Sequence, residues 1–116
     1  MNFSEAVKTC YAKYATFSGR ASRSEYWWFY LFFILVIFAL ASLISISEIF
    51  GMIYGLFILF SFIPTIAVGV RRLHDTDKSG WWILIGLVPF VGLLLIYFLA
   101  IAGTLDDNRF GPAPTR

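Results

Sequence analysis

The chain has 116 residues, of which 59% are hydrophobic and only 14% are charged. Typical globular domains carry about 45–50% apolar and about 25% charged residues, so this composition excludes an ordinary soluble domain of this size. The formal net charge of +2 gives no indication of a nucleic-acid partner, and one cysteine with one histidine excludes an internal disulfide and a cysteine-rich zinc site.

The first predicted element is a short amphipathic helix over residues 4–16. Its apolar residues recur at helical spacing, and its lysines fall on other faces. Such a stripe beside an apolar span is typical of an interfacial helix that lies along a membrane surface. Cys10 is on this stripe, where we interpret it as a small hydrophobic residue rather than a nucleophile.

Three charge-free runs of 22 residues follow, over 26–47, 49–70 and 81–102. A helix of this length measures about 33 Å, which matches the hydrocarbon core of a bilayer, about 30 Å thick. The runs predict an all-α membrane protein: three transmembrane helices preceded by the interfacial helix, in a single domain over 1–116. Because residues 47–48 leave little room for a loop, the first two helices should form a tight antiparallel hairpin.

Prolines interrupt the second and third runs at similar depth. Pro64 and Pro89 each remove one backbone hydrogen bond, which bends a helix and frees a carbonyl near Phe60 and near Ile85. We interpret the bends as packing features, with a cavity open to the cytoplasm as the alternative. The tail over 103–116 is rich in turn residues and proline, and is predicted to be extended.

The distribution of Lys and Arg predicts the orientation. The segments before the first run and between the second and third carry seven of these residues, whereas the tail carries two. The positive-inside rule therefore predicts a cytoplasmic N-terminus and, after three crossings, a C-terminus on the opposite side. Aromatic residues at the cytoplasmic ends of the runs are predicted membrane-interface anchors: Tyr26, Trp27, Trp28, Trp81 and Trp82.

Three boxes of sequence resemble a known family. They read FSGRASRSEYWW at 17–28, VRRLHD at 70–75 with SGWW at 79–82, and NRFGP at 108–112. The chain resembles the small bacterial inner-membrane proteins grouped as domain of unknown function 805. Asp77 and Ala113 depart from that family's usual residues, outside the matching boxes. The resemblance implies a multi-pass inner-membrane protein, here with a periplasmic C-terminus, and supplies no reaction.

The charged residues of two cytoplasmic segments are the candidate functional residues. Topology brings residues 19–25 and 71–80 to one membrane face, where an unpaired carboxylate near low dielectric is costly. We therefore expect Glu25 within reach of Arg71 or Arg72, with His74 at the border of the same cluster. The full candidate set is Arg20, Arg23, Glu25, Arg71, Arg72, His74 and Asp75.

Several functions are compatible with this set. The simplest is a solvated, positive loop; the next are binding of anionic lipid headgroups, which arginine suits, and assembly with a second copy or another membrane protein. An enzyme with His74 as general base is a further alternative, although Asp75 points about 100° away from it on a helix. No cofactor or metal is expected, because the acidic residues near His74 lack ligand spacing.

An oligomeric transporter or channel component is the last alternative, and the spans hold no ionisable residue to relay ions. The hypothesis taken forward is a non-enzymatic inner-membrane protein. Its partners are membrane lipids or another membrane protein, bound at the cytoplasmic rim.

Overall fold

In the computed structural model, which describes residues 1–114, the chain folds into four α-helices and one 3₁₀-helix. Residues 115–116 of the predicted tail lie outside the described part. The all-helical fold class is confirmed. In chain order the helices are α1 (Phe3–Ala12), α2 (Arg23–Ile44), α3 (Ile49–Asp75), the 3₁₀-helix η1 (Gly80–Leu87) and α4 (Gly92–Ala100).

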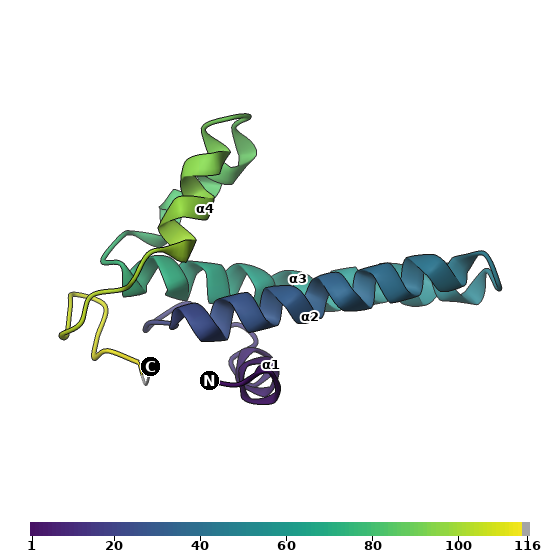
Figure 1. Ribbon diagram of the computed structural model, residues 1–116, viewed down its shortest axis with the longest axis horizontal. Helices are drawn as coiled ribbons and strands as arrows, with labels where there is room; N and C mark the ends of the chain where they lie inside the picture. The colour runs from purple at the N-terminus through teal and green to yellow at the C-terminus, as the bar shows by residue number, and fades with distance from the viewer. Residues whose placement is uncertain (115–116) are drawn as a thin grey trace.

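The two long helices α2 and α3 form an antiparallel hairpin, as predicted (Figure 1). They are about 33 and about 40 Å long. Within residues 1–114, these are the two helices long and apolar enough to cross a membrane. Aromatic rings of the two helices meet at Phe57 of α3, which stacks on Phe33 of α2 with ring centroids 5.6 Å apart.

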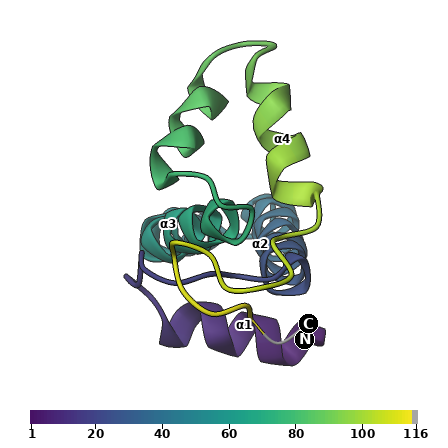
Figure 2. The same cartoon turned by 90° about the vertical axis from the view of Figure 1, so that its left-hand side faces the viewer.

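The third apolar run does not form one helix. It is divided into η1 and α4, joined by a turn at residues 88–91, so that the run folds back on itself (Figure 2). The helices η1 and α4 are each about 14–16 Å long, half the thickness of a hydrocarbon core. The prediction of a transmembrane helix over 81–102 is corrected accordingly. The third crossing, on which the periplasmic C-terminus depended, is absent from the described residues.

The sequence around Pro89 explains the break. A residue that precedes proline avoids the helical region, and Val88 is extended, with φ −97° and ψ 120°. Phe90 then adopts a left-handed conformation with φ 66°, which reverses the chain. Pro64, by contrast, stays inside α3. The carbonyl of Phe60, which lacks a partner at Pro64, accepts a hydrogen bond from the Tyr14 hydroxyl at 2.7 Å.

The first helix, α1, lies across α2 and α3 and is seen end-on in Figure 1. It begins at Phe3 and ends at Ala12, earlier than the predicted residue 16. Its stripe packs on the molecule itself: Tyr11 stacks on Phe60, with centroids 5.6 Å apart, and shares a 2.7 Å hydrogen bond with Ser61. Whether α1 also lies on a membrane surface stays a prediction.

The tail returns to the end of the hairpin where α2 begins and α3 ends, and crosses those helix ends (Figure 2). The backbone N–H of Thr104 donates to the carbonyl of Asp75 at 2.7 Å. We call this end, where residues 16–25, 71–75 and 99–111 meet, the base. The other part of the hairpin, residues 33–59, is the arm. The N-terminal segment and the described tail therefore lie at the same end of the hairpin.

Candidate functional site

Two buried carboxylates organise the base. Asp75 pairs through Oδ1 with Nη2 of Arg20 at 2.9 Å, and through Oδ2 with Nη1 of Arg72 at 2.7 Å. Glu25 pairs through Oε2 with Nη1 of Arg71 at 2.5 Å. None of these five side chains is more than 2% exposed. The predicted pairing of Glu25 with Arg71 is confirmed, and the charged residues form a core rather than a surface.

Three guanidinium groups face two carboxylates in this cluster, and backbone carbonyls of the tail and of the end of α4 before it accept further N–H groups. Arg72 donates from Nε to the carbonyl of Leu99 at 2.9 Å and from Nη2 to that of Ile101. Arg20 donates from Nη1 to the carbonyl of Asp106 at 2.8 Å. Hydrogen bonds from a charged donor are stronger than neutral ones. The buried cations thus fix the tail to the base.

The end of α3 is completed by the other two segments of the base. The last carbonyls of a helix have no partner within the helix. Here the carbonyl of Arg71 accepts from the backbone N–H of Ala21 at 3.0 Å, and that of His74 from Nδ2 of Asn108 at 3.0 Å. Because these donors come from the link before α2 and from the tail, α3 ends where both segments dock.

Gly103 lets the tail approach Asp75 closely. A Cβ at this position would overlap the Asp75 carboxylate. That carboxylate cannot turn aside easily, because two arginines hold its two oxygens. Any larger residue at 103 therefore requires the tail to move.

His74 lies at the border of the cluster, as predicted, but no carboxylate orients it. Its Nδ1 is 2.9 Å from the carbonyl of Gly19, so Nδ1 carries the proton and donates. Its ring stacks on Phe110, with centroids 3.9 Å apart and planes 2° from parallel. Asp75 and Glu25, the residues expected to orient a histidine base, pair with arginines instead. The acid–base pair of the enzymatic alternative is not assembled in this geometry.

The remaining candidates lie at the surface of the base. Arg23 is exposed. Among the predicted anchors, Trp27 donates from Nε1 to the carbonyl of Leu99 at 3.2 Å and meets Tyr26 edge to face. Trp28 and Trp82 are about two-fifths exposed and Trp81 is largely exposed. Their role as membrane anchors stays a prediction.

Cys10 adjoins the cluster without an exposed surface. Its thiol donates to Oε2 of Glu25, with sulfur and oxygen 3.8 Å apart. Burial, followed by the nearby Glu25 carboxylate, raises the pKa of the thiol to about 12. The thiol is therefore protonated at neutral pH, which agrees with its interpretation as a small hydrophobic residue. Among the described residues, no three His, Cys, Asp or Glu side chains are placed to hold a metal ion.

The contacts of the tail with the buried arginines were not predicted from the sequence. Residues 103–116 were expected to form an extended segment on the far side of the membrane. The sequence does contain an indication of these contacts, because three arginines that face two carboxylates need further hydrogen-bond acceptors. Helices use most of their carbonyls internally, so an irregular segment is the natural source of such acceptors.

Comparison with known proteins adds a family to this geometry. The model of a family described as "Protein of unknown function (DUF805)" matches residues 14–112. Inner membrane protein YhaH of Escherichia coli (strain K12) is 46% identical over 110 residues, which cover 87% of this chain and 88% of the relative. Inner membrane protein YhaI of the same strain is 43% identical over 112 residues, 87% of each chain. No solved structure matches significantly.

Proposed function

The chain belongs to the DUF805 family, as its sequence boxes indicated, and from this premise we propose a non-enzymatic inner-membrane protein that binds anionic phospholipid at a cytoplasmic rim. The names of its relatives state a place, the inner membrane, and no reaction. The proposal includes an orientation in which both the N-terminal segment and the described tail face the cytoplasm.

The return of the third apolar run to the base is the observation that carries this orientation. With two crossings instead of three, the tail stays on the side of the N-terminal segment. The excess of Lys and Arg on the proposed cytoplasmic side is then larger than the count of seven against two made from the sequence. All eight Lys and Arg residues within 1–114 lie in the base, in α1 or at its C-cap, or in the loop after α3, and the arm has none.

The exposed cations of this end support lipid binding better than the buried ones. Arg20, Arg71 and Arg72, which the sequence analysis assigned to headgroups, direct their N–H groups at carboxylates and carbonyls inside the base. A second set remains available at the surface: Lys8, Lys13, Arg23 and Arg109 are exposed, and Lys78 is half-buried. Each cation near an anionic membrane surface contributes about 1 kcal/mol.

An exposed apolar surface lies at the tip of the η1–α4 hairpin, on the opposite side of α2 and α3 from α1 (Figure 2). Leu87, the last residue of η1, is 81% exposed, and Phe90, in the turn that follows, is 88% exposed. A protein surface that offers both exposed apolar side chains and basic ones can bind at the headgroup boundary of an anionic bilayer. The hairpin of η1 and α4 therefore supplies the apolar part of the rim, and the surface cations supply its charge.

Native mass spectrometry of the purified protein in mild detergent tests the proposal. We expect phosphatidylglycerol to be retained in preference to phosphatidylcholine. The preference should fall in the triple variant Lys8→Gln, Lys13→Gln, Arg23→Gln. The matched control is Glu48→Gln, a charge change at the far end of the hairpin, which should leave the preference unchanged. Equal retention of the two lipids by the unmodified protein would contradict the proposal.

A further inference from the structure

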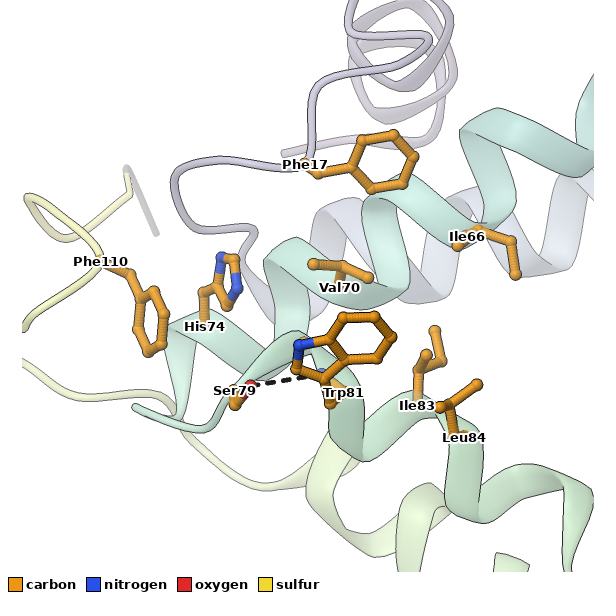
Figure 3. A pocket seen from close by; sticks show the side chains of 10 residues that line it. Phe17, Ile66, Val70, His74, Ser79, Trp81, Ile83, Leu84 and Phe110 are labelled. Carbon is orange, nitrogen blue, oxygen red and sulfur yellow. Dashed lines mark hydrogen bonds between the residues drawn. The ribbon is translucent and has the colours of Figure 1, made fainter.

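A groove of about 500 Å³ lies between α3 and η1, next to the buried cluster (Figure 3). One wall is formed by Ile66, Val70 and His74, one turn apart on α3, and the other by Trp81, Ile83 and Leu84 of η1. Its volume is within the range of small-molecule sites, about 300–1,000 Å³. Apart from its polar end at His74 and Ser79, it is lined by apolar side chains.

The groove has a direction that matches the membrane. Ile66, at its apolar end, lies further along α3 towards the arm, and His74, at its polar end, belongs to the base. A phospholipid of the inner leaflet has the same gradient, with its chains towards the arm and its phosphate level with the base. A soluble metabolite, by contrast, would meet few hydrogen-bonding groups along this surface.

A cation, Arg109, lies next to the polar end, in contact with the lining residue Phe110. The ring of Phe110 stacks on the ring of His74. The guanidinium of Arg109 lies over the Phe110 ring, 4.7 Å from its centroid. The Arg109 side chain is 62% exposed, and its ion pair with Asp77 is a loose 3.3 Å contact at the surface. Arginine suits phosphate because it offers several donors in one plane.

We propose that this groove holds one acyl chain of an inner-leaflet phospholipid, with the lipid phosphate at Arg109 beside His74. The inference rests on the proposed function and gives it a place on the molecule. A groove lined by apolar atoms offers water too few partners to be stably hydrated, and in a bilayer the neighbouring solvent is lipid. The charge at its mouth selects the end at which the headgroup lies.

Filling the groove from either wall tests the proposal. Ile66→Trp and Leu84→Trp place an indole in the groove from α3 and from η1, so that failure of one variant to fold leaves the other. Phe62→Trp is the matched control, because Phe62 is an exposed residue on the same helix outside the groove. Each variant is first shown to elute and melt like the unmodified protein.

Lipid retention is then measured by native mass spectrometry with dioleoyl phosphatidylglycerol and dioleoyl phosphatidylcholine. We expect the unmodified protein and Phe62→Trp to retain one phospholipid. Displacing even two methylene groups weakens binding about tenfold, so each filled variant should lose retention by at least that factor. If both lipids are retained equally and the filled variants lose both equally, the groove is supported and the preference for anionic lipid is contradicted. If phosphatidylglycerol is preferred and the filled variants retain it as well as the unmodified protein does, only the groove is contradicted.

Photo-crosslinking gives a second readout that needs no substitution. Phosphatidylglycerol with a diazirine at the end of one acyl chain is incorporated and irradiated, and the labelled peptides are sequenced. We expect labelling to concentrate at Ile66, Ile83 and Leu84. Labelling of Phe38, an exposed residue of α2 outside the groove, as strong as that of Ile66 would overturn the proposal.

Discussion

The base and the arm of the same helical hairpin are stabilised by different forces. In the arm, Phe38, Met52 and Leu59 are each about two-thirds to three-quarters exposed, and the contacts between α2 and α3 are apolar. In the base, Arg71, Arg72 and Asp75 are fully buried. The usual arrangement of a soluble protein is reversed here: charges lie inside and apolar side chains outside. The reversal follows if lipid is the solvent of the arm.

The comparison also assigns roles to the few charged residues of the chain. A buried ion pair gives little net stability relative to an apolar pair, but losing one partner is expensive because the other charge stays buried. The base is therefore sensitive to single substitutions, and it joins three segments that are distant in sequence. The arm joins two neighbouring helices and tolerates change. The predictions below use this contrast, from the largest effect to the smallest.

The largest effect is expected for Asp75→Asn, because it leaves Arg20 and Arg72 facing a neutral amide. Removing one partner of a buried pair costs about 3–5 kcal/mol. Arg109→Ala, which breaks the exposed pair with Asp77, should cost about 0–1 kcal/mol. Reversible unfolding of the purified protein in detergent measures both. A cost for Asp75→Asn as small as that for Arg109→Ala would refute a structural role for the cluster.

The second prediction concerns the other pair and its compensation. Glu25→Leu alone should cost about 3–5 kcal/mol, since it strands the Arg71 guanidinium, whereas Glu25→Leu with Arg71→Met should be close to neutral. The double variant also removes Nη2 of Arg71, a buried donor without a hydrogen-bond partner among the described residues. The free energies of unfolding of the two single variants and the double variant give the coupling energy between Glu25 and Arg71. If the double variant is as unstable as the sum of the single ones, the two side chains do not interact as described.

The third prediction compares two glycines. Gly103→Ala places a Cβ on the Asp75 carboxylate and should displace the tail, at about 1–3 kcal/mol, the cost of overpacking. Gly55→Ala in the arm meets nothing within 4 Å and should be neutral or stabilising by up to about 1 kcal/mol. The rate of limited proteolysis in the tail and the free energy of unfolding are measured for both variants. We expect faster cleavage and lower stability for Gly103→Ala alone. Equal protection of the tail in both variants would contradict close docking at Gly103.

The smallest effect is expected where the turn after α1 meets α3 near Pro64. Tyr14→Phe removes the donor to the Phe60 carbonyl and should cost about 1 kcal/mol. In a Pro64→Ala background the helix supplies its own N–H to that carbonyl, so the same change should cost less. A double-mutant cycle measures the difference. A coupling energy of zero between positions 14 and 64 would contradict the assignment of the Tyr14 hydroxyl as the replacement donor for the Phe60 carbonyl.

The sequence predicted what depends on charge and apolar periodicity. Charge-free runs identified the α2–α3 hairpin, and the cost of an unpaired carboxylate identified Glu25 with Arg71. Pro64 and Pro89 show where such reasoning ends. Both occupy apolar runs at similar depth, but a tertiary contact from Tyr14 lets α3 continue through Pro64, whereas the chain reverses after Pro89. Because the donor at Pro64 comes from the turn after α1, the local sequence does not distinguish the two cases.

The tail shows the same limit for the site. Its glycine, turn residues and prolines correctly suggested an irregular segment. The position of the tail, and of the end of α4 before it, depends on donors of Arg20 and Arg72, which are 84 and 27 residues away from their acceptors Thr104 and Leu99. The predicted position of the tail on the far side of the membrane depended on a helix over 81–102, and the break of that run after Val88 removes its basis.

The location of the C-terminus is the most direct test of this account. Green fluorescent protein, which fluoresces only in the cytoplasm, and alkaline phosphatase, which is active only in the periplasm, are each fused after Arg116 and expressed at matched levels. Two crossings and a tail docked on the base predict bright fluorescence and no phosphatase activity. Phosphatase activity without fluorescence would restore the third crossing and contradict the joining of both ends of the chain at one face.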